Sequence, residues 1–292
     1  MRCERRAELL CHLGFAAIRT GGIRIGHPHQ LLEVAFAAHA DVLVNRHRTE
    51  PSTGILTRPA DGTLPVPGTR EGLERNMFED VTVIGAGRAG TTIAARLRER
   101  EIRLSENGEL RILCVPDRAI AEVAQSIEPG PWVAHVSGAT PLGALDPHER
   151  RFSVHPLQTL SKDGGAKQLD GAWGGVTAES EDARARGLWL AETLGLRPFI
   201  LADDRRALYH AGASIASNFL VTLYRVAADL VERAGAPPEA LVPLMERTIA
   251  NGFQLTGPIA RGDWSTVDRH RAVLHDTDYA ELYDALAEAT RP

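Results

Sequence analysis

The pattern of apolar and polar positions changes near residue 77. Upstream, apolar residues show brief helical spacing in LLEVAFAAHADVLV, and the segment that follows is rich in proline, glycine and threonine. Such punctuation supports neither helical nor strand periodicity. From residue 78, short apolar runs alternate regularly with amphipathic stretches. We therefore treat residues 1–76 as an N-terminal extension, either a disordered leader or the product of a wrongly assigned start, with Met77 as the alternative first residue.

The regular part of the chain predicts a parallel sheet with helices on its faces. Six apolar runs that end in glycine, proline or small polar residues predict strands: FEDVTVIGAG, ELRILCVPD, PWVAHVSGAT, FSVHPLQTL, WGGVTAES and LRPFILADD. Helical spacing is found in RAGTTIAARLRERE, in DRAIAEVAQSI with Asp117 as its N-cap, and in SEDARARGLWLAETLG. This alternation is typical of α/β folds, so we expect a Rossmann-like sheet over residues 77–202.

Strand patterns cease after Asp203. One helix of about thirty residues is expected up to Gly235, and three further helices follow it. The middle of the long helix is apolar, which favours a position in a bundle or a dimer interface. We expect residues 203–292 to form an all-α substrate and dimerisation domain.

Composition and charge argue against several classes of protein. The formal net charge is -5 and no long basic block is present, which argues against binding to nucleic acid. No apolar run approaches about 20 residues, and the first residues make a poor secretion signal, so we expect a cytoplasmic protein without a membrane span. The three cysteines and the N-terminal histidines lack the partners and spacing of a metal site.

The segment VTVIGAGRAG carries the pattern G-x-G-x-x-G between a strand and a helix. The three glycines serve a tight turn, a close approach to pyrophosphate and the packing of the helix on the strand. The amides and dipole of the helix N-terminus attract phosphate. We predict that this turn binds a dinucleotide, and the alternative is a glycine-rich turn without ligand. The predicted contacts are Gly85, Gly87, Arg88, Ala89 and Gly90.

The adenosine end of the predicted pocket is short. An acidic residue is expected about 20 positions after the glycines, and Glu106 falls near that distance. A parallel neighbour strand needs a crossover of about a dozen residues, whereas a possible strand at 102–104 is followed almost at once by the one at 110–115. We therefore expect the first segment to be either no strand or an antiparallel one. The choice between NAD and NADP stays open.

Several motifs together resemble a known family. VIGAGRAG, CVPDRAI, HVSGA, HPLQTL, LYHAGASIASNFLV and LTGPIARGDWSTVDRHRAVL resemble the Rossmann-like proteins that carry the domain of unknown function 2520. These are distant relatives of ketopantoate reductase, pyrroline-5-carboxylate reductase and the 6-phosphogluconate dehydrogenase group. The resemblance runs from about Phe78 to the C-terminus, without the family's usual second strand, following helix and third strand. It implies an oxidoreductase that binds NADP or NAD, with NADP slightly preferred. We add Pro116 and Ser137 to the predicted cofactor contacts.

Related reductases place a lysine at the start of the helix between the domains, and the matching residue is Arg206. Arginine stays protonated, so Arg206 is suited to hold a carboxylate or an oxyanion and not to act as a general acid. His210 follows on the same helical face and is a candidate proton donor. The alternatives are a surface arginine and a packing histidine.

Other polar residues extend this candidate site. Asn218 follows His210 and Ser214 at intervals of four, a stripe that needs either a ligand or a neighbouring helix. His155 ends a strand, just before Gln158 and Thr159, and the carboxyl ends of strands gather ligands in open α/β sheets. With His135 and Ser137, it is expected on the nicotinamide side, unless it only fixes the turn at Pro156.

The link TGPIARGDW joins two predicted helices. Arg261 is a candidate for binding an anionic substrate or the cofactor of a partner subunit, Asp263 is the expected cap of the next helix, and His270 is expected to be structural. The sequence thus predicts an NAD(P)-dependent oxidoreductase that acts on a small carboxylate-bearing carbonyl, hydroxyl or imine compound. The protein is expected to form a homodimer through its C-terminal helices. A noncatalytic dinucleotide sensor and a helical scaffold with a vestigial Rossmann domain are the alternatives.

Overall fold

The computed structural model describes residues 77–292, which fall into two compact units, residues 77–225 and residues 226–292. The predictions for the extension, including its histidines and the alternative start, lie outside the described residues. The strands are β1 (Asp80–Ile84), β2 (Arg103–Leu104), β3 (Leu110–Leu113), β4 (Trp132–His135), β5 (Arg151–Leu157), β6 (Trp173–Ala178) and β7 (Arg197–Ile200). The helices of the first unit are α3 (Arg88–Glu99), α4 (Ile120–Gln125), α5 (Glu181–Thr193) and α6 (Arg206–Ser214).

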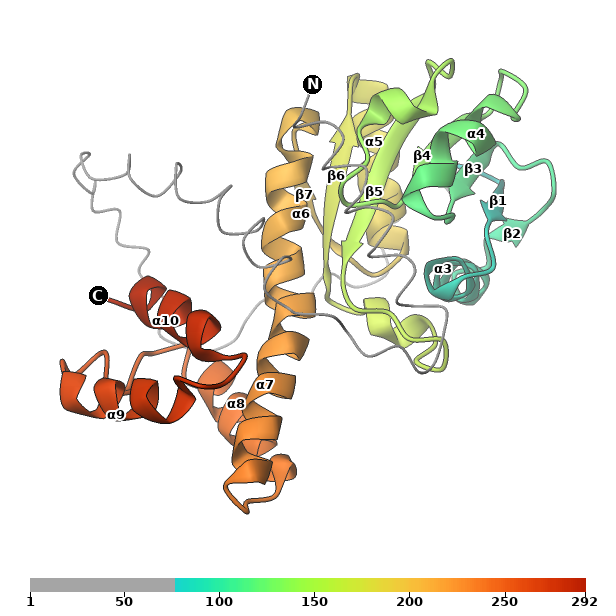
Figure 1. The fold of residues 1–292 in the computed structure, drawn as a ribbon. Coiled ribbons are helices and arrows are strands. Elements are labelled where there is room, and N and C mark those ends of the chain that lie inside the picture. Colours follow the sequence, from blue (N-terminus) through green and yellow to red (C-terminus); the bar gives the residue numbers. More distant parts are fainter. Residues whose placement is uncertain (1–76) are drawn as a thin grey trace, which may run out of the picture. The chain divides into compact units, whose positions relative to one another are not determined.

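The seven strands form one sheet in the order β2-β1-β3-β4-β5-β6-β7 (Figure 1). The predicted Rossmann-like α/β class is confirmed, but the sheet is mixed because β6 runs antiparallel to β5. The chain between these two strands holds a single 3₁₀ turn, Ala166–Leu169, and no crossover helix. A parallel pairing would need such a crossover, so the strands meet antiparallel.

The short segment before β3 corrects one prediction. Residues 103–104 are a strand, and they pair parallel with β1 at Asp80 and Val81. No crossover to β3 is needed, because β1 lies between the two strands and β3 starts beside the same Val81. The linking loop crosses β1 closely: the amide of Gly108 donates to Thr82 Oγ1 at 2.8 Å, and a Cβ there would lie 2.7 Å from the β1 backbone.

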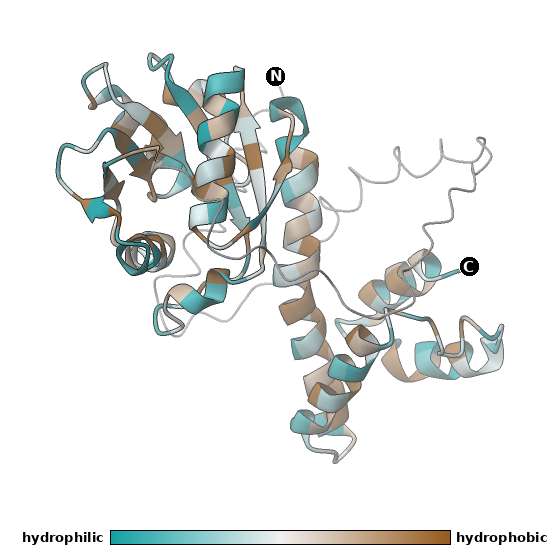
Figure 2. Cartoon of the chain, turned by 180° about the vertical axis from the view of Figure 1, so that it is seen from behind, coloured by the Kyte–Doolittle hydropathy of each residue, from teal (hydrophilic) through white to brown (hydrophobic). Residues whose placement is uncertain are grey.

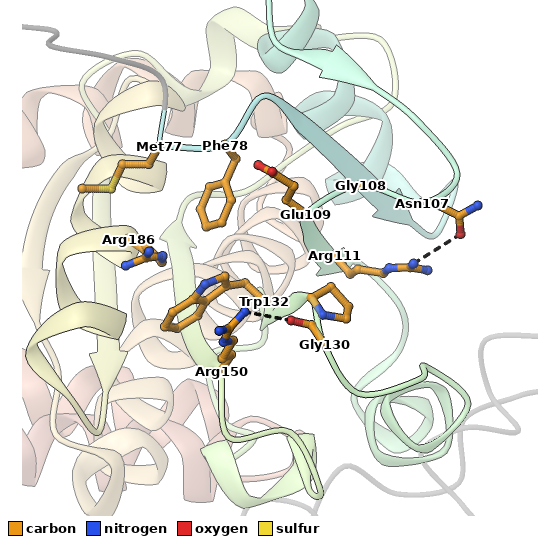
Figure 3. Close-up of a pocket in the computed structure, with 11 residues that line it drawn as sticks. Met77, Phe78, Asn107, Gly108, Glu109, Arg111, Gly130, Trp132, Arg150 and Arg186 are labelled. Atoms are coloured by element: carbon orange, nitrogen blue, oxygen red, sulfur yellow. Dashed lines mark hydrogen bonds between the residues drawn. The ribbon is translucent and has the colours of Figure 1, made fainter.

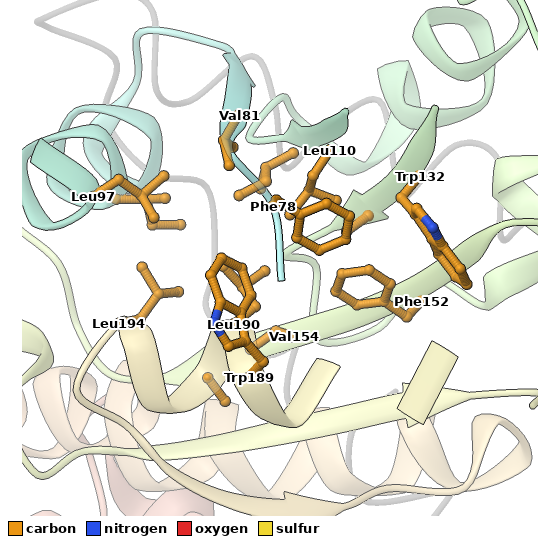
Figure 4. Packing of buried hydrophobic residues seen from close by; sticks show 14 of the residues in the cluster. Phe78, Val81, Leu97, Leu110, Trp132, Phe152, Val154, Trp189, Leu190 and Leu194 are labelled. Atoms are coloured by element: carbon orange, nitrogen blue, oxygen red, sulfur yellow. The ribbon is translucent and has the colours of Figure 1, made fainter. Parts of the chain in front are cut away.

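Two apolar clusters hold the sheet between layers of helices. Leu97 of α3 and Leu190 of α5 pack on one face against residues such as Phe152 (Figure 4), and Ile120 of α4 packs on the other face. Strand side chains alternate between faces. Ser153, next to Phe152, therefore points to the face opposite α5, where it contacts α6. Burying each large apolar side chain contributes about 1.5–3 kcal/mol.

A continuous helix joins the units and begins on the sheet. It runs through α6, a π-helical turn at Ile215–Phe219 and α7 (Leu220–Arg233), and it ends at Gly235 as predicted, with a φ of 82°. Helix Asp203–Arg233 is long and apolar enough to cross a membrane by length and composition, so the statement that no apolar run approaches that length was wrong. Its apolar middle is visible in Figure 2. Because Arg206 ties its first turn to the sheet, we interpret it as part of the globular fold.

The second unit consists of helices, as predicted. Beyond α7 it holds α8 (Leu241–Ala250), α9 (Trp264–Leu274) and α10 (Ala280–Ala289). Asp263 caps α9 by accepting from the Thr266 amide at 3.2 Å, as expected. His270 Nδ1 lies 2.8 Å from the Tyr283 hydroxyl, a contact that links α9 to α10 and agrees with its expected structural role.

Candidate functional site

The glycine turn has the geometry that a bound pyrophosphate requires. Gly85 has a φ of 118°, and a Cβ there would lie 2.4 Å from the carbonyl oxygen of Cys114. A Cβ on Gly90 would lie 1.9 Å from the carbonyl oxygen of Gly85, so α3 packs directly on the turn. Gly87 differs, because a Cβ there would meet nothing within 4 Å. Only Gly85 and Gly90 are thus required by the fold itself, and the open side of Gly87 leaves room for a ligand.

The start of α3 offers unused donors at this turn. Gly87 is the N-cap, it provides no side-chain cap, and the first turn of α3 contains no acidic residue. The first amides of a helix lack partners within the helix, and its N-terminus attracts anions. Arg88 is exposed beside these amides and Ala89 is partly buried. A pyrophosphate would fit here.

The loops after β3 and β4 are joined by a hydrogen-bonded network. Ser137 is buried, and its hydroxyl donates to Asp117 Oδ2 at 2.8 Å and accepts from the amides of Ala139 and Thr140. Asp117 was predicted as an N-cap, but it starts a 3₁₀ turn without capping it. Pro116 is exposed at the start of that turn. The hydrogen bonds of the Ser137 hydroxyl therefore link the two loops.

Arg206 lies inside the protein, with 1% of its surface exposed. Its guanidinium donates to Ser153 Oγ at 2.8 Å, to Thr177 Oγ1 at 2.7 Å and to the carbonyl oxygen of Ser137. These partners belong to β5, β6 and the loop after β4. Both terminal nitrogens are used, so the geometry favours a positioning role for Arg206 over the predicted contact with a substrate carboxylate.

Beside Arg206, three side chains meet at the carboxyl edge of the sheet. His155 Nδ1 lies 2.7 Å from the hydroxyl of Tyr209, and the ring centroids of His155 and His210 are 6.1 Å apart. Gly138, after β4, packs closely against both imidazole rings. A Cβ at this position would lie 2.6 Å from His210 Cδ2 and 2.8 Å from His155 Cε1. We call His155, Tyr209 and His210 the imidazole cluster. The structure thus brings together two histidines predicted from distant motifs.

Burial and neighbouring charges hold two histidines neutral. Burial, together with the electrostatic effects of His210 and Arg206, lowers the pKa of His155 to about 4. Burial, with the charge of Arg206, also lowers the pKa of His135 to about 3. Burial raises the pKa of Tyr209 to about 12. At neutral pH the cluster therefore holds a neutral imidazole hydrogen-bonded to a protonated phenol.

Two members of this arrangement were missed from the sequence, Tyr209 and Gly138. Tyr209 precedes His210 and was overlooked because a helical tyrosine has no distinctive spacing, although a search for hydroxyl donors beside His210 would have found it. Gly138 stands in the quoted motif HVSGAT, where a glycine just after a strand indicates a close approach.

The remaining predicted residues make no hydrogen bond or ring contact with the imidazole cluster in the part of the chain that the structure describes. Asn218 is exposed within the π-helical turn, a feature that is frequent at functional sites. Ser214 ends α6 and is partly buried. Gln158 and Thr159 are exposed after β5. Arg261 belongs to the second unit, where its guanidinium donates to the carbonyl oxygen of Thr256, and its predicted role stays a prediction.

Residues 172–290 match the family model described as a domain of unknown function, DUF2520. This match covers the C-terminal part of the chain and agrees with the resemblance inferred from the motifs. The matched residues include Arg206, Tyr209 and His210, whereas the glycine turn and His155 precede them. No curated protein matches the chain.

Solved structures share the fold. A protein from Bacteroides fragilis described as a candidate NADP oxidoreductase is 23% identical with a TM-score of 0.60, and the match covers 72% of this chain and 97% of that one. A protein from Thermotoga maritima is 22% identical with a TM-score of 0.59, and the match covers 72% of this chain and 96% of that one. An imine reductase from Streptomyces aurantiacus is 17% identical with a TM-score of 0.54, and the match covers 72% of this chain and 92% of that one. At these identities the matches show a common fold, Rossmann-like with a helical C-terminal part.

Proposed function

We propose that this protein is an NAD(P)-dependent oxidoreductase that acts on a small carbonyl, hydroxyl or imine compound carrying a carboxylate. One observation carries the proposal: a glycine turn with open space at Gly87 and the imidazole cluster lie at the same edge of one sheet. The strands that bear them, β1 and β5, are three strand positions apart. At about 4.8 Å per position they are about 14 Å apart, a span that a dinucleotide can cover.

The shape of the sheet supports a pocket with a reduced adenosine end. In a full Rossmann pocket, an acidic residue at the carboxyl end of the strand beside β1 binds the ribose. Here that strand is the two-residue β2, which ends beside Val81, near the opposite end of β1. Glu106 follows β2 at that level and is exposed. Glu106 is therefore out of place for the ribose, and NADP with its extra phosphate stays our slight preference.

When bound, a reduced nicotinamide supplies a hydride to the carbonyl or imine carbon of the substrate. The protein must then orient the acceptor and deliver a proton to its oxygen or nitrogen. With the Tyr209 hydroxyl donating to Nδ1, neutral His155 carries its proton on Nε2, the atom that lies beside Gly138. In this tautomer His155 donates a hydrogen bond to the reacting atom. His210 is the candidate for proton delivery.

Arg206 contributes to this chemistry through its charge. Its guanidinium is sealed from substrate, yet its charge is among the causes that lower the pKa values of His135 and His155. The same field favours negative charge that develops on a substrate oxygen at the imidazole cluster. Recognition of the substrate carboxylate then falls to a cation other than Arg206.

Two measurements separate the oxidoreductase from its alternatives. Calorimetric titration with NADPH and NADH tests the pocket, and the absence of saturable binding by folded protein would leave only the helical scaffold. Oxidation of the reduced cofactor is then measured with 2-keto acids and cyclic imines that carry a carboxylate. Tight cofactor binding without turnover on this panel would favour the noncatalytic sensor.

We also propose that the protein forms a homodimer through its C-terminal helices. Large apolar side chains are exposed along the joining helix, among them Phe219 at 47%, Val221 at 49% and Leu223 at 38%. Apolar surface of this kind marks an interaction site. Light scattering is expected to give twice the mass of 31.6 kDa. Substituting Phe219→Glu should give monomers, and an unchanged dimer would exclude this face.

A further inference from the structure

A cavity lies at the amino edge of the sheet, away from the glycine turn. It has a volume of about 480 Å³ and is lined by Phe78, Glu109, Arg111, Trp132, Arg150, Arg186 and neighbouring backbone (Figure 3). Most of the lining residues stand at the start of β1, β3, β4 and β5, and Arg186 belongs to α5, whereas the glycine turn follows the end of β1. At about 3.3 Å per residue, the five residues of β1 place the two sites about 16 Å apart.

Three arginines, Arg111, Arg150 and Arg186, line the cavity together with a single carboxylate, that of Glu109. Arg111 donates to the Asn107 side-chain oxygen at 3.3 Å, and Arg150 donates to the Gly130 carbonyl oxygen at 3.2 Å (Figure 3). Both acceptors are neutral. Within residues 77–292, neither arginine makes an ion pair, whereas the adjacent Arg151 pairs with two carboxylates.

Two of these arginines also have unsatisfied donors. The Nε atoms of Arg111 and Arg186 are buried and lack a hydrogen-bond partner among the described residues. Leaving a buried donor unpaired is costly, more so when it is charged, and it indicates an absent acceptor.

The third arginine is held in place before any ligand arrives. The guanidinium carbon of Arg186 lies 4.3 Å from the centroid of Trp132, and the same side chain pairs with Asp182. Stacking on an aromatic ring and pairing with a carboxylate orient a planar guanidinium. Because Phe78 and Trp132 are themselves buried, the arginines provide the surface that a ligand meets.

We propose that this cavity binds the phosphate group of a small phosphorylated metabolite. A phosphate dianion matches the two charges of Arg111 and Arg150, and both arginines offer the planar donor pairs that phosphate oxygens accept. The volume is within the range of small-molecule sites and exceeds what a phosphate ion needs, so an ester is the better fit. The site is independent of the dinucleotide at the glycine turn.

The test uses the full chain, with glycerol 3-phosphate, inorganic phosphate and glycerol as probes in calorimetric titrations. We expect saturable binding of glycerol 3-phosphate at millimolar levels or below, weaker binding of phosphate and none of glycerol. Equal binding of the two anions would overturn the preference for an ester, and failure of both anions to bind would overturn the site.

Variants assign the binding to the cavity. Arg150→Gln, at an exposed position, and Arg111→Gln should each lower the affinity for glycerol 3-phosphate at least fivefold. Glu109→Gln should raise the affinity for glycerol 3-phosphate by up to about fivefold, because it removes a negative charge that repels the phosphate at an exposed site. Arg98→Gln, at an exposed arginine of α3 outside the cavity, is the matched control and should leave binding unchanged.

Gly87→Ser distinguishes this site from the glycine turn. Because a phosphate probe also suits the start of α3, binding that persists in Gly87→Ser and falls in Arg150→Gln supports the cavity. Binding that falls in Gly87→Ser and persists in both arginine variants would overturn it. This comparison needs no cofactor, so it holds whether or not the protein proves to be an oxidoreductase.

Discussion

Replacing Gly87 by serine tests the dinucleotide site without disturbing the fold. Gly87 is the N-cap of α3, with a φ of -75° and a ψ of -173°, an extended conformation that serine adopts freely. A Cβ there meets nothing within 4 Å, so the free protein accommodates it. The serine hydroxyl is then placed to accept from one of the first amides of α3.

The size of the effect follows from the amide that the hydroxyl occupies. A hydrogen bond to a charged group contributes about 1.5–3 kcal/mol, so withdrawing one amide from a phosphate should weaken cofactor binding by about 10- to 150-fold. The new side chain also fills the space into which the phosphate would come. Stability should rise by a few tenths of a kcal/mol, because serine is a slightly better N-cap than glycine.

The assay is calorimetric titration of NADPH and NADH into the parent protein and the variant, with thermal unfolding measured in parallel. Gly257→Ser is the matched control, since Gly257 also has open space around its Cβ position and lies in the other unit. It should bind cofactor as the parent does. If Gly87→Ser is folded and keeps the parent affinity, the amides at the start of α3 do not hold a phosphate and the proposed pocket is wrong.

Three further predictions concern the imidazole cluster and its support. Tyr209→Phe should lower kcat about 10- to 100-fold with cofactor affinity unchanged, because His155 loses the partner that sets its tautomer; unchanged steady-state kinetics would refute this role. The pKa of His155 is lowered to about 4 by burial, so the stability that its neutral form contributes is complete above pH 6.5 and is lost as pH falls toward 4. Urea unfolding should show a loss on the order of 3 kcal/mol over this window, smaller in His155→Gln, and parallel pH profiles for parent and variant would contradict the assignment. Arg206→Leu should lower the free energy of unfolding by about 3 kcal/mol, because hydroxyl and carbonyl groups on three elements lose a charged donor; near-parental urea unfolding would show that the contacts contribute little.

Local chemistry made part of this protein predictable from its sequence. The glycine turn, the alternation of strands and helices, the end of the long helix at Gly235 and the cap at Asp263 depend on residues that are close along the chain. Backbone freedom, apolar periodicity and a capping oxygen act over a few positions, so the sequence alone displays them. The resemblance to the DUF2520 family was also recognisable from the order of the short motifs.

Contacts between distant segments decided the rest. Whether β2 pairs parallel, and whether β6 reverses direction, depends on which strand edge is free when the segments meet. The sequence predicts Arg206 as a substrate contact, with a surface position as the alternative, and only the packing of α6 on β5 and β6 buries it. The same packing brings Tyr209 to His155 across 54 positions of sequence. The sequence by itself determined the elements and the glycine turn, whereas burial and pairing, which exist only in the folded chain, decided the chemistry available to each polar group.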